Sequence, residues 1–182
     1  MNIIKKIFIR KKLSLIKLIV LDVDGVLTDG NLYIDSKGNE TKKFNVKDGL
    51  GIKLLQEANI IIALISGGKS DSTLHRIKKL EIKHYFFEVK NKLEILVNLK
   101  KELNLRDSEV LYVGDDLNDL VIKKSVGIFA APKDAVKPVK DSANIILSSI
   151  GGEGAIREIA DIVLDQRDLY KNILKKGWAE KN

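Results

Sequence analysis

The sequence predicts an α/β fold in which a doubly wound, mostly parallel sheet carries helices on both faces. Short runs rich in Ile, Val and Leu recur along the 182 residues, and each has about the length of one strand. Segments with helical spacing of apolar residues separate these runs, which is the alternation that builds a parallel sheet. The runs are apolar throughout, as expected for strands that are buried on both faces.

The predicted elements alternate from the first apolar run onward. Residues 16–23 form a β-branched run that stops at Asp and Gly, which is typical of a buried strand ending at a loop. Further strands are expected at residues 60–65, 110–113, 126–130 and 144–147. Helical spacing predicts helices at residues 49–58, 69–80, 91–103, 118–124 and 153–164.

A β-hairpin is predicted between the first strand and the first helix. Residues 31–35 and 40–46 flank the turn sequence Ser-Lys-Gly-Asn, which favours a tight reversal. In an open α/β sheet, ligands bind beyond the carboxyl ends of the strands. We therefore look for functional residues where the predicted strands end.

The length fits one domain, which we place at residues 16–165. Residues 1–15 are expected to be a basic N-terminal arm, and residues 166–182 a C-terminal helix end and tail. The apolar run after the arm is interrupted by Lys17, so it makes no convincing secretion signal. It also falls short of the roughly 18 uncharged apolar residues that a membrane span needs.

Composition excludes several chemistries. The chain has no cysteine, which rules out disulfides, thiolate-held zinc and a cysteine nucleophile, and a reducing cytoplasm is the expected compartment. The net charge is +7, but the lysines are spread along the chain and aromatic residues make up only 5%. We therefore expect neither a nucleic-acid nor a membrane partner. A basic surface favours a small anionic substrate instead.

The first strand ends in the sequence DVDGVLTDG, which begins at Asp22. Carboxylates as close as those of Asp22 and Asp24 repel by about 4 kcal/mol at an effective dielectric constant of 20. A bound cation would offset this repulsion. A simple Asp-Gly turn is the alternative for the bare pair, and Thr28 and Asp29 directly downstream favour a functional site.

A second acidic motif, VGDDLND, follows the strand predicted at residues 110–113. Asp115, Asp116 and Asp119 place three carboxylates in five positions, which is too much charge for a core. Oxygen ligands of this kind bind hard cations such as Mg²⁺. One of the three can instead cap the following helix.

Two weaker signals lie between the acidic motifs. Ser66 and Gly67 follow a predicted strand, where a hydroxyl and backbone amides suit a phosphate oxygen. Lys92 stands at the start of a predicted helix. Alone, a Ser-Gly pair after a strand is typical of a turn, and a single lysine is typical of a surface charge. Ser66 and Lys92 indicate a functional site because they lie, in this order, between the DxDG and GDDxxD motifs.

These four motifs, in this order, resemble those of the haloacid dehalogenase-like phosphatase superfamily, which implies a Rossmann-like sheet. The resemblance implies that Asp22 attacks phosphorus and that Asp24 protonates the leaving alcohol and then activates water. It also implies that Ser66 and Lys92 balance the charge of the phosphoryl group. A receiver domain also combines acidic residues, a hydroxyl and a lysine, but its acceptor Asp lies at a later strand.

The resemblance also assigns the metal. Mg²⁺ is expected on the carboxylates of Asp22 and Asp115 and on the backbone carbonyl of Asp24. Asp116 and Asp119 are expected to position the metal-bound waters and the catalytic lysine from behind.

No cap domain is expected over this site. Only the hairpin and one helix fit between Asp24 and Ser66, and little more than a helix fits between Lys92 and Asp115. A site without a cap must be closed by something else, and a neighbouring subunit is the natural candidate, so we expect a homo-oligomer. The resemblance implies a homotetramer.

Within the superfamily, residues 16–164 closely resemble the 3-deoxy-D-manno-octulosonate 8-phosphate phosphatase family. The similarity is carried by DVDGVLTDG, the hairpin, FNVKDGLGI, NKL, VGDDLND and GGEGAIRE. It implies dephosphorylation of an eight-carbon keto-sugar acid made for lipopolysaccharide. Besides Asp24 and Lys92, the substrate contacts it implies, some of them from a neighbouring subunit, are Thr28, Asn45, Val46, Lys47, Asp48, Gly49, Lys53, Gly67 and Arg76. For Lys53 and Arg76, ordinary helix-surface charges are the alternative.

One departure keeps a second substrate open. That family typically has Arg directly after the glycine of its second motif, where this chain has Gly68. A relative that acts on a nine-carbon keto-sugar acid phosphate has a different residue there and a basic residue matching Lys79. A non-catalytic partner of a sugar-acid nucleotidyltransferase is a further alternative, although the intact motifs favour an enzyme.

Overall fold

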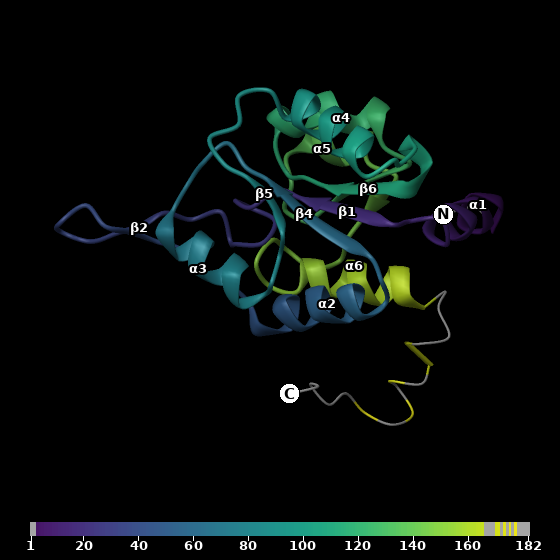
Figure 1. Cartoon of the computed structure of the whole chain (residues 1–182), viewed down its shortest axis with the longest axis horizontal. Coiled ribbons are helices and arrows are strands. Elements are labelled where there is room, and N and C mark those ends of the chain that lie inside the picture. Colours follow the sequence, from purple (N-terminus) through teal and green to yellow (C-terminus); the bar gives the residue numbers. More distant parts are fainter. Residues whose placement is uncertain (1–2, 166–169, 172, 174, 176, 178–182) are drawn as a thin grey trace.

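The sheet at the centre of the molecule is parallel and lies between two layers of helices (Figure 1). In the computed structural model, which describes residues 3–165, 170, 171, 173, 175 and 177, six strands are ordered β5-β4-β1-β6-β7-β8. All five neighbouring pairs are parallel. The predicted α/β class is therefore confirmed. Most of the tail expected at residues 166–182 lies outside the described residues.

Five of the six strands lie inside the predicted apolar runs or extend beyond them by no more than one residue. The strands are β1 (Leu18–Leu21), β4 (Ile61–Ile65), β5 (His84–Phe86), β6 (Val110–Val113), β7 (Ile128–Ala131) and β8 (Ile145–Ile146). Strand β5 escaped prediction because it is a short edge strand whose Tyr85 is 39% exposed, so its apolar pattern is weak.

The five predicted helices are present, and the described residues form three more. The helices are α1 (Ile3–Leu13), α2 (Val46–Glu57), α3 (Asp71–Lys79), α4 (Lys92–Glu102), α5 (Lys137–Ser142) and α6 (Ala155–Leu164), with 3₁₀ helices η1 (Asp107–Glu109) and η2 (Leu117–Ser125). The three beyond the prediction are α1, α5 and η1. The basic segment expected as an arm contains α1, whose Ile9 and Leu13 pack into the core. Within the described part of the chain, no helix is long and apolar enough to cross a bilayer.

Alternate side chains of the four central strands, β4, β1, β6 and β7, pack into two separate cores. Ile19 and Leu21 of β1 face the layer of α2 and α6, whereas Leu18 and Val20 face the layer of α4, η2 and α5. Each fully buried Leu or Ile contributes about 1.5–3 kcal/mol relative to an exposed side chain. This double burial holds the strand ends, and the loops that follow them, in fixed positions.

The predicted hairpin consists of β2 (Tyr33–Ile34) and β3 (Glu40–Thr41), which pair antiparallel and project from the body (Figure 1). An isolated bridge between Thr28 and Phe44 ties its base to the loop after β1. As expected, the hairpin and α2 are the elements that lie between β1 and β4.

Candidate active site

The topology brings three of the predicted motifs to one edge of the sheet. Strand β1 lies between β4 and β6, and Leu21 is in register with both Leu64 and Val113. Asp22 directly follows β1, and the loops after β4 and β6 begin within two residues of the positions that pair with Leu21. Because the three strands are parallel, the loops that follow them lie side by side, as the sequence pattern predicts.

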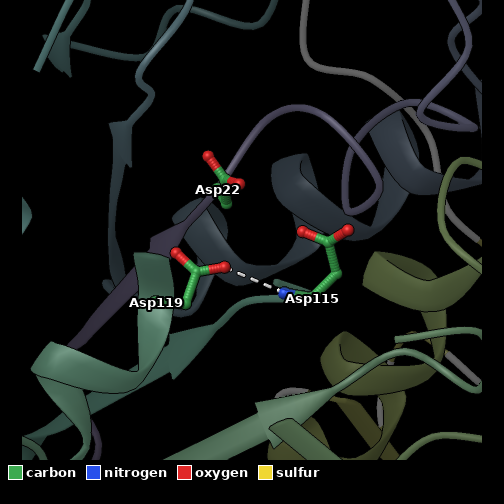
Figure 2. A group of neighbouring side chains, drawn as sticks. All are labelled: Asp22, Asp115 and Asp119. Atoms are coloured by element: carbon green, nitrogen blue, oxygen red, sulfur yellow. Dashed lines mark hydrogen bonds between the residues drawn. The ribbon is translucent and has the colours of Figure 1, made fainter. Parts of the chain in front are cut away.

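Three carboxylates converge at this edge. One oxygen from each of Asp22, Asp115 and Asp119 lies within 4.8 Å of the others, and Figure 2 shows the three side chains close together at this edge. Asp22 and Asp119 are buried, and Asp115 is half-buried. This spacing allows Asp22 and Asp115 to share one ion.

Asp119 is held from four directions. Its Oδ1 accepts hydrogen bonds from Lys92 Nζ at 2.7 Å and from the hydroxyl of Tyr112 at 2.6 Å. Its Oδ2 accepts the backbone N–H groups of Asp115 at 2.9 Å and Asp116 at 3.3 Å. Asp119 therefore holds Lys92 and the loop amides from behind the cluster, and its predicted effect on metal-bound water stays a prediction.

Asp115 presents a ligand atom to the cluster. Its Oδ1 is buried and has no hydrogen-bond partner, whereas buried carboxylate oxygens are normally paired. Gly25, with φ of 75°, packs so closely on this carboxylate that any β-carbon there would collide with it. The loop that carries Asp24 thus lies directly against Asp115.

The electrostatics of the cluster favour a cation. Burial raises the pKa of Asp22 to about 6, helped by the charge of Asp119 and opposed by Lys92. Burial also raises the pKa of Asp115 to about 8, with further contributions from the neighbouring carboxylates. One lysine does not balance this negative charge. The unpaired oxygen of Asp115 and the all-oxygen donor set fit a hard divalent ion such as Mg²⁺.

Lys92 is buried inside the cluster, only 2% exposed. Its ammonium lies 3.0 Å from Asp22 Oδ1 and 2.7 Å from Asp119 Oδ1. Asn91 caps the start of α4 by accepting the N–H of Glu94, which fixes where the lysine enters. A lysine at this depth persists only because carboxylates surround it.

Asp116, in contrast, is exposed. Its Oδ1 accepts the N–H of Leu117 at 2.7 Å, and Asp119 completes a capping box at the start of η2. The capping role foreseen for one of the three carboxylates thus belongs to Asp116. Its contact with metal-bound water stays a prediction.

Asp24 is bound by a residue that the sequence analysis missed. Lys42 Nζ, which comes from the hairpin, donates to both carboxylate oxygens of Asp24 at 2.7 and 2.9 Å. Thr28 Oγ1 lies 3.4 Å from Asp24 Oδ1. Among 32 basic residues, nothing in the sequence distinguishes Lys42. Tyr112 was also missed, although a hydroxyl in an otherwise apolar strand is a usable signal.

The loop after β4 lies beside Asp24. Ser66 is 2% exposed, and its Oγ accepts the N–H of Gly68 at 3.1 Å. A β-carbon at Gly68 would lie 3.4 Å from Asp24 Oδ2 and 3.9 Å from Ser66 Oγ. Gly67 is exposed next to them. The predicted phosphate loop and the predicted general acid are therefore neighbours.

Several of the predicted substrate contacts also cluster. Arg76 donates to the backbone carbonyl of Asn45 at 3.0 Å, and its guanidinium lies so close to Gly49 that a β-carbon there would collide with it. Asn45 caps α2 by accepting the N–H of Lys47 at 2.7 Å. Val46 is 82% exposed beside them. Lys53, further along α2, is half-buried.

Asp48, another of the predicted substrate contacts, turns its carboxylate to the start of α6. It is fully buried, and its two oxygens accept the N–H groups of Gly154 at 3.2 Å and Arg157 at 2.8 Å. These amides belong to the start of α6, so Asp48 caps that helix from α2. Its contact with the substrate stays a prediction.

Comparisons with known proteins agree with this geometry. The haloacid dehalogenase-like hydrolase family matches residues 45–127. The chain is 41% identical over 155 residues to 3-deoxy-D-manno-octulosonate 8-phosphate phosphatase KdsC of Haemophilus influenzae, covering 85% of this chain and 86% of that protein. The enzyme of the same name from Escherichia coli K12 is 39% identical over 82% of this chain and 79% of its own length.

Solved structures show the same fold. The 3-deoxy-D-manno-octulosonate 8-phosphate phosphatase of Moraxella catarrhalis, crystallised with magnesium, phosphate and KDO, superposes with a TM-score of 0.90 at 35% identity. That match covers 93% of this chain and 98% of the other. The cobalt-bound Haemophilus influenzae enzyme superposes with a TM-score of 0.83 at 38% identity, covering 90% and 99% of the two chains.

Proposed function

Since this chain belongs to the 3-deoxy-D-manno-octulosonate 8-phosphate phosphatase family of haloacid dehalogenase-like hydrolases, we propose that it is a Mg²⁺-dependent phosphatase for that sugar-acid phosphate. The products are the free sugar acid and inorganic phosphate, in the synthesis of lipopolysaccharide precursors. The observation that carries the proposal is the convergence of Asp22 and Asp115 around a common point beside the buried ammonium of Lys92.

Two carboxylates perform the bond changes. An oxygen of Asp22 attacks phosphorus, and the bond from phosphorus to the C8 oxygen of the sugar breaks. Asp24 gives its proton to that leaving oxygen. Asp24 then takes a proton from water as the water attacks the phosphorus of phospho-Asp22, which releases phosphate and regenerates the nucleophile.

The remaining residues manage charge. Lys92 and Ser66, at the ends of the elements around Asp22, stabilise the phosphoryl oxygens. Asp22, Asp115 and the backbone carbonyl of Asp24 hold Mg²⁺, which when bound offsets the repulsion between anionic substrate and anionic nucleophile. Asp119 keeps Lys92 and the loop amides in place through its four hydrogen bonds.

Phosphate release from a substrate panel tests this proposal. We expect kcat/KM for the eight-carbon keto-acid phosphate to exceed that for hexose phosphates and for the nine-carbon keto-acid phosphate by about tenfold or more. EDTA should abolish activity and Mg²⁺ should restore it. Turnover that ignores EDTA would contradict the metal site. Full biological function of an Asp22→Asn protein would instead favour a non-catalytic role.

Two finer statements belong to the proposal: a homotetramer and a cytoplasmic location. Four exposed apolar side chains on and near the hairpin support assembly: Leu32 (60%), Tyr33 (44%), Ile34 (63%) and Val46 (82%). The lack of cysteine suits a reducing compartment. In a tetramer, a neighbouring subunit would close the site above residues 45–49, Lys53 and Arg76, where the sugar acid is expected.

A further inference from the structure

We propose that Lys42 is a positioning residue that holds the carboxylate of Asp24 where the leaving group of the substrate will lie. This inference rests on the proposed phosphatase function. Lys42 Nζ contacts both oxygens of the Asp24 carboxylate, at 2.7 and 2.9 Å, so it fixes the orientation of the carboxylate as well as its position. In the acid form, one oxygen carries the proton for the leaving group and the other accepts from Lys42.

The burial of the two side chains is unequal. The side chain of Lys42 is 3% exposed, whereas that of Asp24 is 38% exposed. The ammonium therefore lies beneath the carboxylate and leaves the carboxylate accessible from the open side. Removing an ammonium from water costs several kcal/mol, which here is offset by Asp24 and by Glu40, whose Oε1 lies 3.5 Å away.

The hairpin that carries Lys42 is anchored around Asp24. Next to it, Lys43 pairs with Glu153 at 3.2 Å, and the hydroxyl of Tyr33 donates to Asp29 at 2.7 Å. The bridge between Thr28 and Phe44 closes the base. Lys42 is therefore a fixed point in the fold, and its ammonium is not a mobile surface charge.

A fixed partner matters because general acid catalysis depends on distance. The acid must come within about 2.6–3.2 Å of the leaving oxygen, and it contributes typically 10²- to 10⁴-fold to the rate. Without Lys42, Thr28 Oγ1 at 3.4 Å is a weak restraint, and the carboxylate can turn among its side-chain rotamers. Hydrolysis of phospho-Asp22 is common to all esters, whereas kcat/KM reports the transfer of the phosphoryl group to Asp22. Loss of Lys42 should therefore lower kcat/KM in proportion to the need of each ester for protonation of its leaving oxygen.

Two phosphate esters with different leaving groups distinguish a role of Lys42 in positioning the general acid from a general role in the fold. The alkoxide of the keto-sugar acid phosphate requires a proton to leave, whereas 4-nitrophenolate leaves readily without one. We expect Lys42→Met to lower kcat/KM for the sugar-acid phosphate by about 100-fold and for 4-nitrophenyl phosphate by less than about threefold. KM should change little, and Lys42→Arg should recover about tenfold or more of the lost kcat/KM.

Lys43→Met is the matched control, since Lys43 is the adjacent lysine, also forms an ion pair, and is 53% exposed. Both esters should be hydrolysed within about twofold of wild type by this variant. The same selective loss in Lys43→Met would overturn the inference, because hairpin anchoring in general would then explain it.

Retained activity of Lys42→Met on 4-nitrophenyl phosphate also shows that the variant is folded. Equal losses on both esters, or no loss, would overturn the role of Lys42; should Lys42→Met fail to fold, Lys42→Gln is judged by the same criteria. Wild-type protein that hydrolyses neither ester with Mg²⁺ would instead contradict the proposed function itself.

Discussion

At the scale of single residues, the site is defined by charges that burial alone would not tolerate. Asp22, Asp119 and Lys92 are at most 6% exposed, and the free oxygen of Asp115 is buried beside them. Each buried charge is tolerated because a group of opposite charge lies beside it. The carboxylates outnumber the ammonium of Lys92, and a metal ion would balance the remaining negative charge. The metal-free protein should therefore carry measurable electrostatic strain.

Replacing Asp115 by Asn should abolish the response to Mg²⁺. In the wild type, Mg²⁺ at about 100 times its Kd should stabilise the fold by about 2.7 kcal/mol, a rise in Tm of about 5–10 °C for a chain of this size. Asp115→Asn should show no such rise and no phosphatase activity. Thermal melts with and without Mg²⁺ measure this; Asp141→Asn, an exposed carboxylate, is the control that keeps the response.

The stability of the metal-free protein should fall as pH rises. The pKa values of Asp22, about 6, and Asp115, about 8, lie above the ordinary 3.8. Between pH 4 and 8 the folded state therefore holds more protons than the unfolded state, so the free energy of unfolding decreases with pH across this window.

Mg²⁺ requires these carboxylates ionised, so its stabilising effect should grow from pH 6 to pH 8. Melting curves at both pH values with and without Mg²⁺ test the sign. A larger Mg²⁺-induced rise in Tm at pH 6 than at pH 8 would contradict the raised pKa values.

At the scale of elements, the loops of the site are fixed by contacts between segments distant in sequence. Gly152, with φ of 64°, packs so closely against the backbone of Thr28 and Asp29 that a side chain there would collide. The turn before α6 thereby supports the loop after Asp22, and Asp48 caps the same helix from α2.

Asp48→Ala tests whether this residue is a cap. Loss of a cap costs about 0.5–2 kcal/mol, and two partly buried amides of α6 would also lose their partner. We expect Tm to fall by about 4–8 °C, with KM little changed in the protein that stays folded. Asp141→Ala, which breaks an exposed ion pair with Lys137, should cost less than about 0.5 kcal/mol. A higher KM at unchanged Tm would contradict the capping role and favour the predicted substrate contact.

At the scale of the whole molecule, the hairpin projects from the body (Figure 1). It carries exposed apolar side chains on a chain that is otherwise rich in charge. Leu32 and Ile34 are 60% and 63% exposed. Their burial between subunits would stabilise an assembly by about 1.5–3 kcal/mol per side chain.

The double variant Leu32→Ser, Ile34→Ser should dissociate the proposed tetramer. Sedimentation should give four times the 20.4 kDa chain mass for wild type and a smaller species for the variant. Val97→Ser, an exposed apolar residue on α4, serves as the control. A monomeric wild type would contradict the assembly. The dissociated variant should also show a raised KM, because the neighbouring subunit no longer closes the site.

The sequence by itself determined the sheet and the acidic centre. Buried parallel strands are local apolar runs, and their carboxyl ends must meet at one edge, so both acidic motifs could be placed at that edge from the sequence. The family resemblance then indicated that Asp22 and Asp115 share one ion, and their oxygens do lie close enough for this. Ser66 and Lys92 followed from their order among the motifs.

Only the tertiary structure decided which side chains support these groups. Lys42 on Asp24, Tyr112 on Asp119 and Asp48 at the start of α6 are pairs whose partners are fixed by packing between elements. The physical reason is that a hydrogen bond requires atoms within about 3 Å. Hydrophobic periodicity identifies elements and their buried faces, but the relative placement that sets such distances arises when those faces pack together.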